Sequence, residues 1–248
     1  MKTKYGLIGY PLEHSFSKDF FNRKFASENV DAEYLNFQID NIRELGNVLR
    51  GNPSLGGLNV TLPYKMQVIA RLDDLDKDAR MIGAVNVIKF VRGRFGRRKL
   101  KGFNSDITGF RQSIAPLLNE SHRNALILGT GGASKAVFHG LKQLGVNPVF
   151  VSRSDEDFCL AYRDLTPRIM EQYTVIVNTT PVGMYPDVGR SPDIPYDLLT
   201  PGHLLYDLLY NPDETAFLLE GKKRDCTVKN GLEMLILQAY ESWRIWNM

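Results

Sequence analysis

The segment Ala125-Leu126-Ile127-Leu128-Gly129-Thr130-Gly131-Gly132-Ala133-Ser134 decides the fold class of this chain. Its first four residues are apolar, as in a buried strand, and a helical pattern extends from its end to Leu144. A strand, a glycine turn and a helix in this order are the context in which a G-x-G-x-x-G-like sequence binds a dinucleotide. The first glycine permits the tight turn, the second lets the backbone approach a pyrophosphate, and the helix N-terminus attracts negative charge.

The glycine turn predicts which residues contact the cofactor. We expect the pyrophosphate to lie against Gly129, Gly131, Gly132, Ala133 and Ser134. Ser134 stands at the third position of the motif, where Gly or Ala is usual. A glycine turn can also be purely structural, but the flanking strand and helix favour nucleotide binding.

The end of the next predicted strand indicates the type of cofactor. It reads Ser152-Arg153-Ser154, where an NAD-preferring site usually has an Asp or Glu for the ribose 2′-hydroxyl. An arginine would instead bind a 2′-phosphate, so this tripeptide favours NADP. A solvated surface arginine is the alternative, and the acidic residues 155–157 weaken the argument for a phosphate. The stretch from Arg153 to Val175 is also short, so we expect one helix to be missing there.

The composition excludes several classes of protein. The 248 residues are 43% hydrophobic and 24% charged, with two cysteines, which excludes a disordered tail and a disulfide scaffold. A net charge of +3 is too small to indicate a polyanionic partner. Cys159 and Cys226 form no metal-spaced cluster, so we expect buried, reduced thiols and no metal. Since neither a signal sequence nor a membrane span is visible, we expect a cytoplasmic protein.

Strand-like and helix-like segments alternate along the chain and predict parallel α/β sheets. Strands are expected at residues 5–8, 33–38, 58–60, 125–128, 149–151, 175–177 and 204–206, and helices beyond residue 17, at 42–49, at 107–118 and after the glycine turn. Residues 84–91 and 95–100 are expected to form a hairpin. An apolar stripe at helical spacing predicts a C-terminal helix in which Trp243 and Trp246 pack. Because two α/β series meet near residue 106, we expect two domains with a cleft between them.

Small polar residues gather at strand ends in the first half of the chain. Ser15 and Ser17 follow the first strand, so they are either helix N-caps or, with the helix N-terminus, a carboxylate-binding site. Three further polar groups follow later strand ends, at residues 59–65, 83–86 and 102–106. A lysine is normally solvated, but Lys65 and Asp106 together in a cleft would form a general acid–base pair.

These polar segments and the glycine turn resemble the motifs of the shikimate dehydrogenases in order and spacing. The matching segments are Ser15-Phe16-Ser17, residues 59–65, residues 83–86, Asn104-Ser105-Asp106, residues 129–134, Asn178-Thr179-Thr180-Pro181-Val182-Gly183-Met184, Tyr206-Asp207-Leu208-Leu209-Tyr210, and Asn230-Gly231-Leu232 with Gln238. The resemblance extends from residue 5 to about residue 243. It implies a shikimate-binding catalytic domain of residues 1–106 with 232–248, and an NADP-binding Rossmann domain of residues 107–231. The implied reaction is the NADPH-dependent, reversible reduction of 3-dehydroshikimate to shikimate, an oxidoreductase step in chorismate and aromatic amino-acid biosynthesis.

The resemblance also implies roles for individual residues. The substrate carboxylate would be held by Ser15, Ser17 and Tyr210. The ring hydroxyls and the reacting oxygen would be bound by Thr61, Lys65, Asn86, Asp106 and Gln238, with Lys65 as the proton donor and Asp106 beside it. The adenosine phosphate would be bound by Ser152, Arg153 and Ser154, and the ribose or nicotinamide would lie near Thr180, Val182, Leu208 and Gly231.

Two other functions fit parts of the sequence. The acidic residues after Arg153 would suit a quinate/shikimate dehydrogenase that accepts NAD, and loss of turnover would leave a non-catalytic dinucleotide-binding module. The presence of Lys65 and Asp106 counts against the second function. The basic residues of the hairpin at 92–101 are typical of solvated charge, so we expect a small-molecule substrate and neither nucleic acid nor membrane as partner. The chain is expected to be a monomer or a homodimer.

Overall fold

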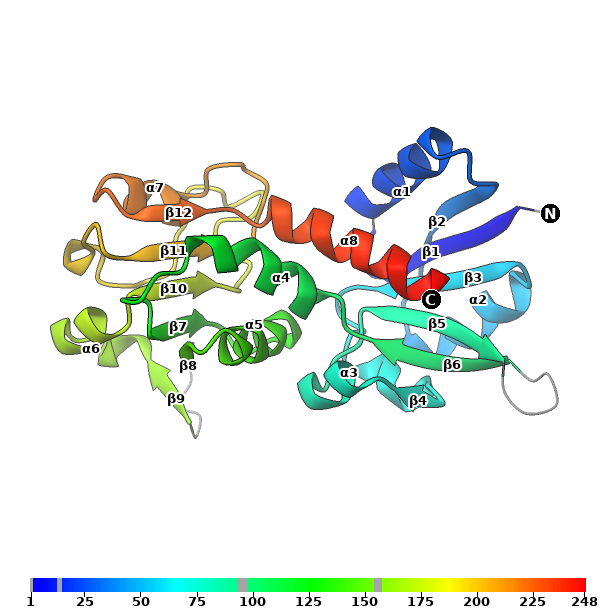
Figure 1. The fold of residues 1–248 in the computed structure, drawn as a ribbon, viewed down its shortest axis with the longest axis horizontal. Helices are drawn as coiled ribbons and strands as arrows, with labels where there is room; N and C mark the ends of the chain where they lie inside the picture. The colour runs from blue at the N-terminus through cyan, green and yellow to red at the C-terminus, as the bar shows by residue number, and fades with distance from the viewer. Residues whose placement is uncertain (1, 13–14, 93–97, 154–157) are drawn as a thin grey trace. The chain divides into compact units, whose positions relative to one another are not determined.

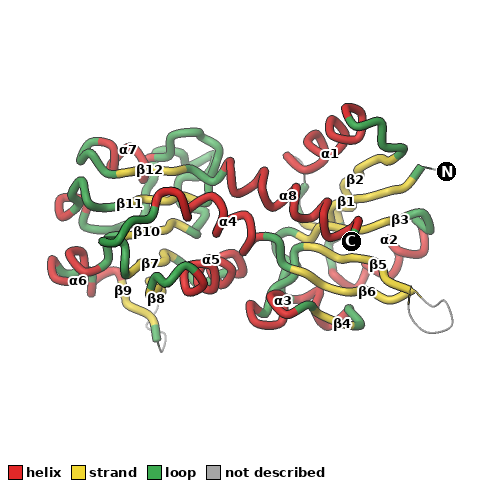
Figure 2. Tube along the Cα trace, viewed as in Figure 1, coloured by secondary structure: helices red, strands yellow, loops and turns green. Residues whose placement is uncertain are grey.

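Two six-stranded sheets, each formed by its own part of the chain, organise the fold (Figures 1 and 2). The computed structural model describes residues 2–12, 15–92, 98–153 and 158–248. The chain divides into a first unit of Met1–Ser105 with Ala239–Met248, and a second unit of Asp106–Gln238. The division falls inside the last helix, α8 (Leu232–Asn247). No helix in the described ranges is long and apolar enough to cross a membrane.

The first unit contains a mixed sheet with the strand order β2-β1-β3-β5-β6-β4. Its strands are β1 (Thr3–Gly9), β2 (Ala32–Gln38), β3 (Leu55–Val60), β4 (Asp74–Leu75), β5 (Val87–Arg92) and β6 (Arg98–Phe103). Its helices are α1 (Phe16–Ser27), α2 (Leu45–Gly51) and α3 (Lys77–Ile82), with short 3-10 helices at Ile42–Glu44 and Gln67–Arg71. Strand β1 pairs in parallel with β2 and β3, whereas β5 is antiparallel to β3 and β6.

The expected hairpin is confirmed, with shifted ends. Strands β5 and β6 pair antiparallel from Val87 opposite Phe103 to Arg92 opposite Arg98. A short connection permits only this pairing, because parallel neighbours require a long crossover. The expectation of parallel strands therefore holds in the first unit for the pairs of β1 with β2 and β3 and of β4 with β6, whereas the pairs of β5 with β3 and β6 are antiparallel. The hairpin turn, residues 93–97, lies outside the described part of the chain.

Aromatic side chains dominate one face of the core of the first unit. Tyr5 from β1, Phe21 from α1 and Tyr34 from β2 are buried there together with Trp246 from α8. The Trp246 ring stacks on the Tyr5 ring at a centroid distance of 4.7 Å, and Trp243 packs against the same cluster. The prediction that the two tryptophans are packing residues is confirmed.

The second unit contains a fully parallel sheet with the strand order β12-β11-β10-β7-β8-β9. Its strands are β7 (Asn124–Leu128), β8 (Asn147–Ser152), β9 (Cys159–Ala161), β10 (Val175–Asn178), β11 (Leu204–Asp207) and β12 (Thr227–Lys229). Its helices are α4 (Asp106–Ile114), α5 (Gly132–Gln143), α6 (Pro167–Gln172), α7 (Ala216–Lys222) and the start of α8, with 3-10 helices at Ala115–Leu117, Tyr162–Asp164 and Tyr196–Leu198. The expected order of strand, glycine turn and helix is confirmed by β7 and α5.

The strand order of the second unit is that of a dinucleotide-binding fold. Counted along the chain, the strands lie in the order sixth, fifth, fourth, first, second, third, which is the Rossmann arrangement. The connection from β8 to β9 spans only residues 153–158, which is shorter than the roughly dozen residues of an ordinary parallel crossover. Four of these residues, 154–157, lie outside the described part of the chain. Neither cysteine forms a disulfide within the described part of the chain; Cys226 is buried and Cys159 is half-buried.

Candidate functional site

The carboxyl ends of three neighbouring strands meet at one edge of the second sheet. Leu128 of β7, Asn178 of β10 and Asp207 of β11 are register partners there. In an open α/β sheet, ligands bind outside the carboxyl ends of the strands at the point where the strand order reverses. The order reverses here between β7 and β10, so the loops after these two strands form the candidate cofactor site.

The glycine turn after β7 leaves room for a phosphate group. Gly129 has a φ of +102°, and a Cβ at this position would come within 3.0 Å of Thr180. Gly131 is the N-cap residue of α5, and no described atom lies within 4 Å of the place where its Cβ would be. The first N–H groups of a helix have no partner within the helix and attract anions. The turn therefore fits a pyrophosphate.

Ser134 fits the third position of the motif because its side chain folds back onto the turn. The side chain is fully buried, and its hydroxyl donates to the Gly131 carbonyl oxygen at 2.5 Å. The hydroxyl is thus satisfied inside the protein. A bound anion would meet the backbone N–H groups of the first turn of α5 rather than this side chain.

The loop after β10 is held by its own polar side chains. The Thr179 hydroxyl donates to the Leu128 carbonyl oxygen at 2.6 Å, which ties this loop to the end of β7. The backbone N–H and the hydroxyl of Thr180 donate to Asn178 Oδ1 at 3.0 and 2.7 Å. The N–H of Val182 donates to the Thr180 hydroxyl at 3.3 Å. Thr180 and Val182, both expected near the ribose or nicotinamide, therefore share one braced turn.

The structure brings together Leu208 and Gly231, the other two residues expected near the ribose or nicotinamide. A Cβ on Gly231 would overlap the Leu208 carbonyl oxygen, so only glycine fits against this backbone. The Gly231 N–H donates to the Leu209 carbonyl oxygen at 2.9 Å, and the Leu208 N–H donates to the Asn178 carbonyl oxygen at 2.9 Å. The segments after β10, β11 and β12 thus support one another.

The segment expected to read the 2′-phosphate begins at the end of β8. Ser152 is buried as the last residue of that strand, and Arg153 is exposed directly after it. The charge of Arg153 acts on Tyr162, whose pKa is raised by burial and lowered in part by this arginine. Ser154 and the acidic residues 155–157 lie outside the described residues.

A hydrogen-bond network in the first unit links one predicted site residue, Asn86, to four residues without a predicted role. The Asn86 amide donates to Ser105 Oγ at 3.0 Å, and the Ser105 N–H donates to Asn86 Oδ1 at 2.7 Å. Ser105 Oγ lies 3.2 Å from Ser242 Oγ, which accepts from the Asn59 amide at 3.0 Å. The Tyr34 hydroxyl donates to Asn59 Oδ1 at 2.8 Å. Asn59 and Ser105 stand in polar motifs, whereas Tyr34 and Ser242 lie in segments whose pattern indicates packing.

Ser15 and Ser17 differ in their contacts at the start of α1. Ser15 has the backbone position of an N-cap, but its hydroxyl makes no capping hydrogen bond. This oxygen is buried and has no hydrogen-bond partner among the described residues. The Ser17 side chain acts on the hydroxyl of Tyr34, whose pKa is raised by burial and lowered in part by this serine. The missing cap bond does not support the capping alternative for Ser15. Buried polar atoms in proteins normally have a hydrogen-bond partner, so the Ser15 hydroxyl is suited to bind a ligand atom.

Thr61 and Lys65 lie in the segment after β3. The Thr61 N–H donates to the Ile8 carbonyl oxygen at 2.9 Å, which ties this segment to the end of β1. The Lys65 carbonyl oxygen accepts from the Val85 N–H at 2.7 Å, and the residue is half-buried. Lys65 is therefore not a fully solvated surface lysine.

Asp106, Tyr210 and Gln238 belong to the second unit. Asp106 is only 2% exposed and begins α4. Gln238 of α8 packs on Gly109 of α4, where a Cβ would come within 3.1 Å of the Gln238 Cβ. Tyr210 is half-buried, and burial raises its pKa. The other residues expected to bind substrate belong to the first unit.

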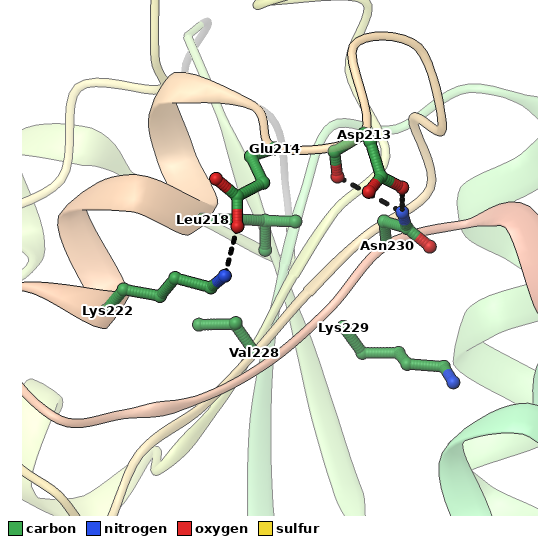
Figure 3. Close-up of a pocket in the computed structure, with 7 residues that line it drawn as sticks. All are labelled: Asp213, Glu214, Leu218, Lys222, Val228, Lys229 and Asn230. Atoms are coloured by element: carbon green, nitrogen blue, oxygen red, sulfur yellow. Dashed lines mark hydrogen bonds and ion pairs between the residues drawn. The ribbon is translucent and has the colours of Figure 1, made fainter.

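A separate pocket of about 230 Å³ lies beside α7 and β12 (Figure 3). It is lined by Asp213, Glu214, Leu218, Lys222, Val228, Lys229 and Asn230. Lys222 pairs with Glu214, Lys229 pairs with Glu233 at 2.5 Å, and the Asp213 carboxylate accepts from the Asn230 amide. None of the predicted site residues lines this pocket, and its paired charges leave little to attract a ligand.

Comparisons with known proteins point to one family. Residues 7–88 match the family model described as the shikimate dehydrogenase substrate binding domain. The chain is 35% identical to a shikimate dehydrogenase (NADP+) of Methanococcus aeolicus, over 99% of this chain and 92% of that relative. It is 33% identical to a shikimate dehydrogenase (NADP+) of Bacillus cereus, over 99% of this chain and 93% of that relative.

Solved structures agree with these relatives. The crystal structure of shikimate dehydrogenase from Aquifex aeolicus superposes with a TM-score of 0.86 at 34% identity, covering 99% of this chain and 92% of that one. The enzyme of Thermus thermophilus in complex with NADP(H) and shikimate gives a TM-score of 0.86 at 28% identity, covering 98% of this chain and 93% of that one. The similarity therefore extends over both units.

Proposed function

Because the chain belongs to the shikimate dehydrogenase family, we propose that it catalyses the NADPH-dependent, reversible reduction of 3-dehydroshikimate to shikimate. This reaction is an oxidoreductase step in chorismate and aromatic amino-acid biosynthesis. The observation that carries the proposal is the glycine turn at the switch point of a six-stranded parallel sheet, in a chain that matches NADP+-dependent relatives over its whole length. The two units would be the substrate-binding and the NADP-binding parts of the enzyme.

We assign the cofactor to the loops at the carboxyl edge of the second sheet. The open position at Gly131 and the free N–H groups of α5 support placing the pyrophosphate against Gly129, Gly131, Gly132, Ala133 and Ser134. The adenosine 2′-phosphate would be bound by Ser152, Arg153 and Ser154, and the ribose and nicotinamide by Thr180, Val182, Leu208 and Gly231. When bound, the nicotinamide supplies the hydride.

We assign the substrate carboxylate to Ser15, Ser17 and Tyr210. The hydroxyl of Ser15 is buried and has no hydrogen-bond partner in the described part of the chain, which supports this assignment because a carboxylate oxygen would give it a partner. The ring hydroxyls would be bound by Thr61, Asn86 and Gln238. The network behind Asn86 fixes the orientation of its amide, and a site built to pair hydroxyls rejects analogues that lack them.

We assign the proton transfer to Lys65. Reduction of a ketone creates a negative charge on its oxygen, and an adjacent ammonium group can stabilise that charge and donate the proton. In the direction of oxidation the neutral amine would take the proton back. Asp106, buried at the start of α4, would hold the ammonium group in place. Both reaction directions should therefore depend on one shared ionisation.

The proposal is tested by an assay of shikimate and quinate, each with NADP and with NAD. We expect the highest kcat/KM for shikimate with NADP, read as the change in absorbance at the wavelength of the reduced nicotinamide. Absence of turnover with all four pairs, in protein shown to be folded, would refute an enzymatic function. A higher kcat/KM for quinate or NAD would refute the stated substrate or cofactor.

A further inference from the structure

Asp207 is a buried carboxylate that has no role in the proposed chemistry. It is the last residue of β11, and its exposed fraction is 0%. Its Oδ1 accepts from the Asn178 amide and the Leu209 N–H, both at 3.0 Å, and its Oδ2 accepts from the Thr215 hydroxyl at 2.6 Å. Within the described part of the chain, no Lys or Arg forms an ion pair with it. Hydrogen bonds from neutral donors therefore stabilise this buried charge.

The donors to Asp207 come from the end of β10 and from the two ends of the segment that connects β11 to α7. Asn178 is the residue whose Oδ1 braces the turn of Thr180 and Val182. Leu209 lies in the loop that carries Leu208 and Tyr210. Thr215 is the N-cap of α7, where its hydroxyl accepts from the Leu218 N–H at 3.4 Å. One carboxylate thus fixes two ligand loops and the start of a helix.

The donors also determine which form of the carboxyl group the network needs. Both the amide of Asn178 and the N–H of Leu209 can only donate toward Asp207. A protonated Asp207 would place an O–H donor opposite groups that are themselves donors, and its protonated oxygen would be a poorer acceptor for their hydrogen bonds. The ionised form therefore matches the surroundings, although burial opposes it.

We propose that Asp207 is a positioning residue whose ionised carboxylate holds the loops of Thr180–Val182 and Leu208–Tyr210 in the conformation that binds NADP. The proposal rests on the proposed function only for the assignment of these loops to the cofactor. It predicts that weakening the Asp207 network lowers the affinity for NADP more than the loss of one buried hydrogen bond elsewhere in the same unit does.

The test compares Thr215→Val with Thr215→Ser and Ser113→Ala. Thr215→Val removes the hydroxyl that donates to Asp207 and keeps the shape of the side chain. Thr215→Ser keeps the hydroxyl and removes only the methyl group. Ser113→Ala is the matched control, because Ser113 is 2% exposed and its hydroxyl lies 2.6 Å from that of Tyr206 in the same unit. All are measured by calorimetric titration with NADP and by thermal unfolding.

We expect Thr215→Val to raise the Kd for NADP about tenfold, the scale of one lost hydrogen bond to a charged group. Thr215→Ser should keep the wild-type Kd, and Ser113→Ala should lower the Tm without changing the Kd. An unchanged Kd in Thr215→Val, with a Tm loss like that of the control, would overturn the proposal. The binding assay needs no turnover, so wild-type protein that binds NADP but does not oxidise shikimate would refute the proposed function alone.

The pH dependence of the affinity for NADP distinguishes a positioning role of the Asp207 charge from a purely structural role of this residue. Burial raises the pKa of Asp207 to about 6, although its hydrogen bonds to Thr215, Leu209 and Asn178 lower it in part. Among the described residues, Tyr196 is a titratable group whose pKa the charge of Asp207 raises. Because the ionised form binds, affinity should fall as the pH drops through 6. A phosphate monoester also titrates near pH 6, so Asp207→Asn supplies the baseline. Wild type should lose more affinity than this variant; equal losses would overturn the role of the charge.

Discussion

Lys65 is the residue on which the proposed chemistry depends most directly. Replacing it by alanine removes the proton donor, whose contribution is typically 10²–10⁴-fold, so kcat should fall by about that factor. The KM for shikimate should change much less, because the carboxylate and hydroxyl contacts remain. Steady-state kinetics in both directions, on protein whose fold is checked by circular dichroism, measure this. A kcat close to that of the wild type would remove Lys65 from the proton transfer.

Ser15 allows ligand binding to be separated from helix capping. Its hydroxyl makes no capping hydrogen bond and is buried with no partner among the residues that the structure describes. Ser15→Ala should therefore raise the KM for shikimate and leave the Tm unchanged or higher. Asp76→Ala is the control, since the Asp76 carboxylate caps α3 by accepting from the Ala79 N–H at 2.8 Å. That variant should lose about 1 kcal/mol of stability. A Tm loss in Ser15→Ala with an unchanged KM would support the capping role instead.

At the residue scale, the sequence predicts the motif positions but not how each side chain is used. Ser134 was expected at the pyrophosphate, yet its hydroxyl bonds to Gly131 within the turn. Tyr34 and Ser242 join the polar network although they lie far apart in sequence from Asn86. These partners are tertiary contacts. Local spacing carries no signal for them.

At the scale of elements, a substitution in the glycine turn should change the affinity for NADP without changing the stability of the fold. Gly131 has a φ of −71° and open space around its Cβ position, so Gly131→Ala should fold normally. It should nevertheless weaken NADP binding, because a methyl group would occupy the place where the backbone approaches the pyrophosphate. Gly51→Ala, at the end of α2 and equally free of neighbours, is the control and should not affect binding. Equal Kd values for both variants would place the phosphate elsewhere.

The turn before β7 is held by a buried histidine and should make stability depend on pH. His122 is 6% exposed, its Nδ1 accepts from the Asn119 N–H at 3.1 Å, and burial lowers its pKa below 6.5. Below pH 6.5 the unfolded chain therefore binds more protons at this site than the folded chain. The free energy of unfolding consequently decreases as the pH is lowered from 6.5 to the pKa of His122 in the folded chain. Urea unfolding of His122→Asn across this range should show a smaller pH dependence than wild type. Identical profiles would contradict the assignment.

Elements with long apolar runs are predictable, and short ones are not. The strands β7, β10 and β11 carry consecutive buried apolar residues, and β8 carries a run of buried and half-buried ones; the sequence predicts all four. In contrast β4, β9 and β12 contain two or three residues each, too few to show a period. Such strands exist because a neighbouring strand supplies their hydrogen bonds. Whether two strands of the first unit run parallel or antiparallel likewise depends on which strands become neighbours in the sheet, and the sequence pattern of a single strand does not show this.

At the scale of the whole molecule, the last residues of the chain complete the core of its first part. Residues 239–248 belong to the first unit although the whole second unit lies before them in the sequence. Trp246 is 7% exposed there, and its indole nitrogen donates to the Ile88 carbonyl oxygen at 3.2 Å. The apolar stripe predicted this helix, but not the strand on which it packs. The first unit therefore cannot finish folding until the entire chain is available.

Trp246→Ala should consequently destabilise the first unit selectively, by about 3–5 kcal/mol, the usual cost of deleting a large buried side chain. The chain has two tryptophans, Trp243 and Trp246, and both belong to the first unit, so the fluorescence of Trp243 in this variant reports on that unit alone. In urea, the fluorescence transition should move to lower concentration, while part of the circular dichroism signal persists to the wild-type midpoint because the second unit keeps its own core. NADP should still bind and should raise only the later transition. If both signals instead shift together, the two units unfold cooperatively, and α8 transmits stability from one to the other.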